Sequence, residues 1–162
     1  ATMMSNLGLE KKLSENSISL IRTAVGDRYI KEEIMKKNLS IGGEQSGHII
    51  MKDYGLSGDG MISALQILSI LKDQSKPSSE LLKVFDPIPQ KLINFQISDP
   101  GILELKETKD IIDSYEQKLT ADGRIFLRMS GTEPLLRVMI ECTDQKKLDK
   151  IEIELNSYFS KF

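Results

Sequence analysis

The chain has 162 residues, of which 40% are apolar and 28% charged, the composition of a globular protein with room for one ordinary domain or two small ones. Its net charge of −2 argues against a nucleic-acid-binding surface, which needs a basic face. No apolar run is long enough to cross a bilayer, no signal-peptide pattern opens the chain, and a single histidine without a Cys/His cluster argues against a zinc site. The one cysteine, Cys142, falls in an apolar strand and predicts a buried thiol in a reducing compartment. We therefore expect a cytoplasmic protein without nucleic-acid or membrane partners.

The first half of the chain alternates predicted strands with predicted helices, which indicates an α/β domain. The first residues resemble the end of a strand rather than a natural start, so a fragment of a longer protein is expected. Asp27 is the predicted N-cap of a helix that turns Ile30 and Ile34 inward. The expected elements are, in chain order, a strand ending at Met4, a helix from Ser5 to about Asn16, a strand at 19–22, the helix after Asp27, a strand at 39–41 and an apolar run at 48–51.

The most apolar predicted helix begins after Asp59. Its apolar residues are Met61, Ile62, Ala64, Leu65, Ile67, Leu68, Ile70 and Leu71. Because such a helix is apolar on almost every side, it is expected to be buried on most of them. The composition then turns polar at 73–79, which predicts a domain boundary bridged by a short helix at 79–85.

The second half has the predicted order strand, helix, strand, strand, helix. Residues 93–98 alternate apolar with polar side chains, which is typical of a strand with one solvated face. Two further strands, at 124–129 and 135–142, are joined by a turn. The stripes of the two helices are Ile111, Ile112, Tyr115 and Leu119, and Leu148, Ile151, Leu155, Tyr158 and Phe162. This order predicts a small α+β domain, an antiparallel sheet covered by two helices.

The turn between the last two strands carries the motif R-M-S-G-T-E-P-L-L-R at 128–137. Ser130, Gly131 and Thr132 offer two hydroxyls and close backbone approach, and Arg128 and Arg137 stand at the two ends. Guanidinium groups bind phosphate bidentately, so the turn is a candidate phosphate cradle. A plain hairpin turn with two solvated arginines is the other interpretation of the same residues.

A second motif, G-G-E-Q-S-G-H, occupies 42–48. Its three glycines permit a tight backbone, and Glu44 and Ser46 can hydrogen-bond sugar hydroxyls. A simple turn between strands explains the spacing equally well. The single histidine makes it a poor metal site.

Four ordered blocks then carry a family resemblance along the whole chain. They are M-S-N-L-G-L-E at 4–10, R-T-A-V-G-D-R-Y at 22–29, G-G-E-Q-S-G-H at 42–48 with G-D-G at 58–60, and R-M-S-G-T-E-P-L-L-R-V at 128–138. The chain resembles the carboxyl-terminal part of the α-D-phosphohexomutases, in the branch that acts on glucosamine phosphates. The glutamine in the third block and the V-G-D-R-Y run point to that branch.

The resemblance implies most of the third of four domains at 1–73, a connector at 74–83, and the fourth domain at 84–162 with a TATA-box-binding-protein-like fold. In this family a phosphoserine of the first domain phosphorylates glucosamine 6-phosphate. The resulting bisphosphate turns end for end and returns its other phosphate to the serine, which leaves glucosamine 1-phosphate for cell-wall precursor synthesis. The resemblance further implies Mg²⁺ in the second domain and a glucose or glucosamine 1,6-bisphosphate activator.

Carried onto this chain, the resemblance assigns two groups of site residues. The sugar-binding group is Glu44, Ser46, Gly43, Gly47 and His48, with Asp27 and Arg28 as further substrate-facing residues. The phosphate-binding group is Arg128, Ser130, Gly131, Thr132 and Arg137. For Asp27 and Arg28, a helix cap and a surface ion pair are equally good interpretations.

The chain departs from the family in lacking the serine loop and the aspartate-rich metal loop. We therefore expect no catalytic residue and no metal ligand here, and no mutase activity from the chain alone. Its expected partners are a phosphosugar and the missing amino-terminal domains. The helix that precedes the third domain's first strand in the family is also absent, which should leave part of the first sheet uncovered, so self-association or disorder of the truncated domain is expected. The main alternative is a stand-alone, non-catalytic phosphosugar-binding module, and a nucleotide-binding domain is disfavoured because no G-x-x-x-x-G-K-[ST] motif occurs.

Overall fold

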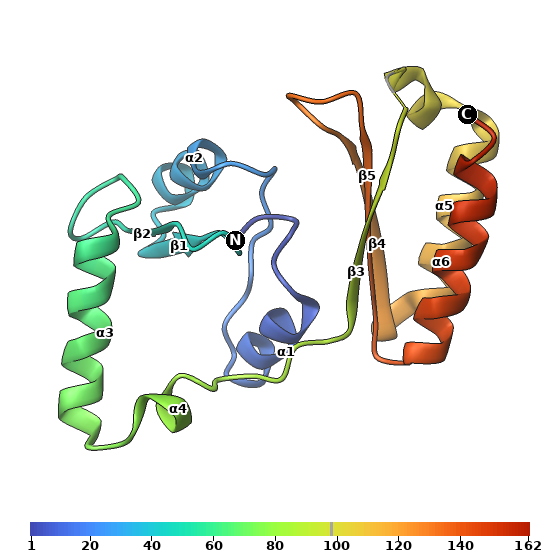
Figure 1. Ribbon diagram of the computed structural model, residues 1–162. Helices are drawn as coiled ribbons and strands as arrows, with labels where there is room; N and C mark the ends of the chain where they lie inside the picture. The colour runs from blue at the N-terminus through green and yellow to red at the C-terminus, as the bar shows by residue number, and fades with distance from the viewer. Residues whose placement is uncertain (98) are drawn as a thin grey trace. The chain divides into compact units, whose positions relative to one another are not determined.

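In the computed structural model, which describes residues 1–97 and 99–162, the chain divides between Asp86 and Pro87 into two units (Figure 1). Each unit has its own hydrophobic core. An α/β unit is followed by a unit with an antiparallel sheet and helices, so the predicted fold class is confirmed.

The first unit contains four helices and a two-stranded antiparallel sheet among its described elements. These elements are α1 (Leu7–Glu15), α2 (Asp27–Lys37), β1 (Ile41–Gly43), β2 (Ile49–Met51), α3 (Gly60–Gln74) and α4 (Ser78–Leu81). Asn6 caps α1, since its side chain accepts from the Gly8 N–H at 2.8 Å. The core is small: Ile30 and Ile34 of α2 pack with Ile50 of β2.

Four expectations for the first part of this unit are wrong. No strand ends at Met4, because Met3 and Met4 lie in a turn. Residues 19–22 form no strand, and the chain there is held by an isolated parallel bridge between Thr2 and Thr23. Asp27 does not cap α2, because Gly26 occupies the N-cap position and Asp27 is the first helical residue. A carboxylate in the first turn still interacts favourably with the helix dipole, so Asp27 stabilises the start of α2 although it is not the N-cap. The strand expected at 39–41 lies two residues later, as β1.

Helix α3 is far less buried than its composition predicts. Asp59 caps it as expected, accepting from the N–H groups of Met61 and Ile62. Met61 is 72% exposed, and Leu65 and Leu68 are exposed by more than half. Met61, Leu65 and Leu68, which are three and four residues apart, therefore form an apolar stripe on α3 that no described element of its own unit covers.

The second unit is organised around the three-stranded antiparallel sheet β3-β5-β4 (Figure 1). Its elements are β3 (Gln90–Phe95), a 3₁₀ turn η1 (Pro100–Glu104), α5 (Lys106–Leu119), a 3₁₀ turn η2 (Thr120–Asp122), β4 (Gly123–Met129), β5 (Leu136–Cys142) and α6 (Gln145–Phe159). The predicted order of strands and helices is confirmed. Strand β3 ends at Phe95, earlier than the alternation suggests, and Ser98 lies outside the described residues.

Helices α5 and α6 cover one face of this sheet (Figure 1). Tyr115 and Leu119 of α5 share one core with Leu148, Ile151 and Leu155 of α6; α5 packs against β4, and α6 packs against β5 and β3. The thiol of Cys142 is buried at the end of β5, as predicted. The stripe of α6 departs from expectation at its end: the helix stops at Phe159, which is buried, whereas Phe162 is 55% exposed.

The other face of the sheet carries Arg124 and Arg128 of β4, because Ile125, Leu127 and Met129 turn toward the helices and side chains alternate along a strand. Arg124 forms an ion pair with Glu141, which is fully buried. Removing either partner of a buried pair leaves an uncompensated charge, so this pair fixes the hairpin at the end far from its turn.

Candidate functional site

The 42–48 motif folds as the connection between β1 and β2. Gly43 pairs with Ile49 in the ladder, the Glu44 N–H donates to the His48 carbonyl at 2.9 Å, and the Gly47 N–H donates to the Glu44 carbonyl at 3.0 Å. Gly47 has φ = 97°, a conformation that glycine adopts without the penalty of a side chain. A Cβ on Gly43 would meet the His48 carbonyl at 3.1 Å. The glycines thus permit a tight loop that leaves Ser46 and His48 exposed.

Glu44 is held in place by the backbone of a distant segment. Its Oε1 accepts from the Gly26 N–H at 2.9 Å, and its side chain is only 12% exposed. Its Oε2 lies 3.9 Å from His48 Nδ1, which is itself 3.1 Å from the Ser46 hydroxyl. One carboxylate oxygen is therefore used for positioning, and the other faces a small polar group that can hydrogen-bond hydroxyls.

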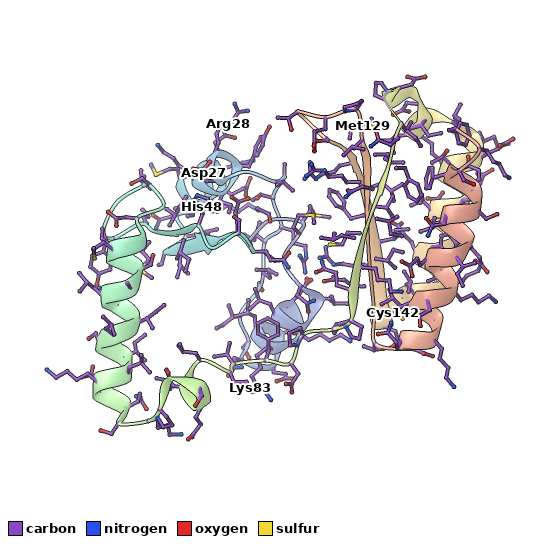
Figure 2. All side chains as sticks on the ribbon, viewed as in Figure 1. Asp27, Arg28, His48, Lys83, Met129 and Cys142 are labelled. Carbon is purple, nitrogen blue, oxygen red and sulfur yellow. The ribbon has the colours of Figure 1, made fainter. Side chains whose placement is uncertain are left out.

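The tie to Gly26 also brings the start of α2 beside this loop, the region where Figure 2 labels Asp27, Arg28 and His48. Asp27 and Arg28 are both exposed there. The Arg28 guanidinium lies over the Tyr29 ring at 4.8 Å and 3.6 Å from Glu32. The structure thus places the sequence-predicted sugar residues together, with Arg28 resting on its own helix.

The 128–137 motif forms the tip of the β4-β5 hairpin. Arg128 and Arg137 are direct cross-strand partners, so their side chains project from the same face of the sheet. Met129 and Cys142 in Figure 2 mark the turn end and the far end of the hairpin. The Ser130 N–H is engaged with the Leu135 carbonyl at 2.8 Å. The N–H groups of Gly131 and Thr132 have no acceptor in the part of the chain that the structure describes, so they are free to bind an anion.

The two arginines are only partly neutralised. Arg137 Nη2 contacts Glu133 Oε2 at 2.6 Å, whereas Arg128 has no carboxylate partner within residues 1–97 and 99–162. The Nε atoms of both arginines are buried and have no hydrogen-bond partner among the residues that the structure describes. Burial lowers the pKa of Arg128, and the charge of Arg137 lowers it further. Two like charges facing each other across a ladder are destabilising, and an anion between them would remove that cost.

Gly131 is not required by the local backbone. A Cβ built there would meet nothing within 4 Å. The space that it leaves open lies beside the free N–H groups and the Thr132 hydroxyl, where a ligand could approach closely.

Two features of the sequence were missed as parts of these groups. Gly26 positions Glu44 although the two residues are 18 apart, and nothing local in the sequence reveals that bond. Glu133 forms an ion pair with Arg137; its place inside the arginine-flanked motif was a usable signal.

No cluster of three or more His, Cys, Asp or Glu side chains suited to a metal ion occurs among the described residues. Within the same residues, every helix is too short or too polar to cross a membrane.

Two domain families match the chain in sequence order. Residues 1–88 match the family described as Phosphoglucomutase/phosphomannomutase, alpha/beta/alpha domain III, and residues 92–156 match its C-terminal domain. The chain belongs to the phosphoglucomutase/phosphomannomutase family. The sequence-based assignment to the carboxyl-terminal part of such an enzyme is thereby confirmed.

Relatives of known name agree with this family. The phosphoglucosamine mutase of Brucella anthropi is 49% identical over 151 residues, which is 93% of this chain and 34% of the relative. Among solved structures, N-acetylglucosamine-phosphate mutase in its substrate complex superposes with a TM-score of 0.78 at 21% identity, covering 97% of this chain and 37% of that one. The Aspergillus fumigatus N-acetylphosphoglucosamine mutase in complex with GlcNAc-6P and magnesium gives 0.75 at 18% identity, covering 99% and 38%. The structural likenesses establish the fold, and the chain spans about a third of the length of these phosphohexomutases.

Proposed function

We propose that this chain is the substrate-recognition half of a phosphoglucosamine mutase, which interconverts glucosamine 6-phosphate and glucosamine 1-phosphate in the cytoplasm. The observation that carries the proposal is the hairpin tip. It holds two cross-strand arginines with buried Nε atoms and two backbone N–H groups, none of which has a partner in the described part of the chain. The 49% identity to a phosphoglucosamine mutase supports the choice of sugar.

In the proposed reaction, Arg128 and Arg137 bind the phosphate that is not being transferred. Their donors form charge-assisted bonds to its oxygens, and Ser130, Gly131 and Thr132 supply hydroxyl and N–H donors. Positioning is most of what phosphoryl transfer requires from a protein, so a rigid clamp on the distal phosphate contributes directly to the rate. Because the bisphosphate intermediate binds in two orientations, the clamp must accept the phosphate at either end of the sugar.

In this proposal, Glu44 and Ser46 form hydrogen bonds with the sugar hydroxyls. Gly43, Gly47 and His48 shape the loop that carries them. Asp27 and Arg28 lie beside this loop and face the substrate. The Gly26 N–H holds Glu44 at 2.9 Å before any ligand arrives, which reduces the ordering cost of binding. We assign the phosphoserine, the magnesium ligands and the 1,6-bisphosphate chemistry to the amino-terminal domains of the longer protein. No step is assigned here to a catalytic side chain of this chain.

Amide chemical-shift titrations test the proposal with three ligands: inorganic phosphate, glucosamine 6-phosphate and glucosamine. Phosphate should shift the amides of 128–137 alone, and glucosamine 6-phosphate should shift these and the amides of 43–48. Glucosamine alone should bind most weakly, since it lacks the charge that the arginines recognise. Shifts confined to other surfaces would refute the assignment.

A pair of serine variants sharpens the test. Ser46→Ala removes an exposed hydroxyl of the 42–48 loop, and Ser79→Ala removes one from α4. We expect Ser46→Ala to weaken glucosamine 6-phosphate binding several-fold, about the size of one hydrogen bond, with phosphate binding unchanged. Ser79→Ala should alter neither. Equal behaviour of the two variants would remove Ser46 from the sugar-reading group.

A further inference from the structure

Glu133 occupies an unusual position for an acidic residue. It lies within the turn that joins the two arginines, followed by Pro134, and its Oε2 contacts Arg137 Nη2 at 2.6 Å. Its side chain is 54% exposed and that of Arg137 is 37% exposed, so the contact is at the surface and open to competition. A carboxylate next to the donors that would grip a phosphate has the wrong charge for a phosphate-binding group.

The contact explains how the hairpin tolerates its paired arginines without a ligand. Arg128 and Arg137 face each other across the ladder, and only Arg137 has a carboxylate partner among the described residues. An intramolecular anion on one of two facing cations halves the unfavourable charge at the tip. Glu133 therefore neutralises a positive charge that an external anion would otherwise neutralise.

We propose that Glu133 is a built-in counter-ion that occupies Arg137 in the free site and is displaced when a phosphate monoester binds. The inference rests on the proposed phosphate-binding role of 128–137 and goes beyond it by assigning Glu133 the part of a competitor. A phosphate monoester carries close to two negative charges at neutral pH and three acceptor oxygens, so it can outcompete a single carboxylate for a bidentate guanidinium. The carboxylate then repels the bound dianion, which weakens binding and speeds release.

Such weakening suits an enzyme whose intermediate must leave the clamp and bind again in the opposite orientation. A clamp without a competitor would hold the distal phosphate longer, since affinity differences within one site appear mainly in the dissociation rate. Glu133 is thus a positioning residue that acts through Arg137, and it makes no bond to the substrate.

The test compares Glu133→Gln with the wild-type chain, using inorganic phosphate as the probe in calorimetric titrations at low salt. Glutamine keeps the size of the side chain and removes the charge. We expect phosphate to bind about two- to fivefold more tightly, the scale of an exposed ion pair, and the gain to shrink as salt is added. Glu80→Gln is the matched control, because Glu80, on α4 of the other unit, also forms an exposed i,i+4 ion pair, with Lys76 at 3.0 Å. It should leave phosphate affinity unchanged, which separates a local effect from a change in net charge.

Urea unfolding supplies a second readout. Without phosphate, Glu133→Gln should be slightly less stable than the wild type, because the repulsion between Arg128 and Arg137 is then unrelieved. In saturating phosphate that difference should disappear or reverse. A carboxylate with only a structural role would lower stability equally with and without phosphate, and that result would overturn the inference.

The outcomes separate this inference from the proposed function. If the wild type binds phosphate and Glu133→Gln binds it equally or more weakly, the counter-ion role is refuted while the phosphate site stands. If only Glu133→Gln binds phosphate, the counter-ion role is supported in its strongest form. If neither chain binds phosphate at millimolar concentrations, the phosphate site fails, and the counter-ion role fails with it.

Discussion

Replacing Arg128 with alanine should weaken anion binding without weakening the fold. Arg128 faces the charge of Arg137, and among the described residues its only hydrogen-bond acceptor is the Met129 carbonyl, at a long 3.4 Å. Its positive charge therefore adds little to the stability of the free chain. Bound to phosphate, the same guanidinium would supply a charge-assisted bond worth about 1.5–3 kcal/mol. Since each ~1.4 kcal/mol is tenfold in affinity, phosphate binding should fall by about one to two powers of ten.

Arg124→Ala is the matched control on the same strand and the same face. Arg124 lies four residues earlier and pairs with Glu141, which is fully buried. Removing one partner of a buried pair costs about 3–5 kcal/mol, so Arg124→Ala should lower the urea midpoint strongly. In the folded fraction, phosphate affinity should stay near that of the wild type. Arg128→Ala should show the opposite behaviour, with a change in unfolding free energy within about 1 kcal/mol.

Calorimetric titration of phosphate and urea unfolding of the three chains measure both quantities. Equal phosphate affinities for the wild type and Arg128→Ala would take Arg128 out of the site and leave the hairpin tip as a plain turn. A parallel loss of affinity and stability in Arg128→Ala would show that the arginine is structural.

Four more outcomes are expected. The purified chain should show no turnover of glucosamine phosphates above a blank, even with magnesium and a 1,6-bisphosphate, and turnover in preparations free of host mutase would contradict the division of roles proposed above. Hydrogen exchange should be slower in 84–162 than in 1–73, because the second unit has the larger core; the reverse order would refute this. A hydrogen bond from the Lys91 ammonium lowers the pKa of Asp149 below its ordinary 3.8, so the pair stabilises the fold above that range and is lost as pH falls through the lowered pKa. The stability difference between wild type and Asp149→Asn should therefore be present at about pH 6 and shrink as the pH falls below 3.8, as read from urea midpoints; a difference that stays constant in acid would exclude the ion pair as its source. Leu68→Lys, on the exposed stripe of α3, should reduce self-association in sedimentation velocity, and an unchanged distribution would place the contact elsewhere.

The sequence predicted those parts of the fold that depend on local pattern. Alternation and period located β4, α5 and α6, because each of these elements packs one apolar face against the core, and β5 was located by its continuous apolar run, since the strand is buried on both faces. The prediction for the end of α6 was wrong. Phe162 continues the apolar spacing in the sequence, but the helix ends at Phe159, which occupies the core position instead.

Other parts could not be predicted because they depend on contacts that no local pattern of the sequence specifies. An all-round apolar helix such as α3 shows that cover is needed, and composition does not show which polypeptide supplies it. Residues 19–22 have strand-like composition, yet the one bridge nearby joins Thr2 to Thr23 in parallel, which no local signal specifies. The candidate phosphate group was predictable because it lies within ten consecutive residues, whereas the bond from Gly26 to Glu44 spans two separate motifs.

Because Arg128 pairs with Arg137 across the β4-β5 ladder, the length of the loop between these strands affects whether both arginines can bind the same anion. Side chains alternate between the two faces of a sheet, so a one-residue slip of β4 against β5 would turn one arginine toward α5 and α6 and leave the other alone. The buried Arg124–Glu141 pair at the far end resists such a slip, because the same shift would also separate those charges. After a single insertion or deletion between Ser130 and Leu135, the loop must absorb the change, because a slipped register would separate the buried pair and the opposed arginines together. Loop exchange among related hairpins can vary the chemistry of the tip freely, provided that the number of residues in it is preserved.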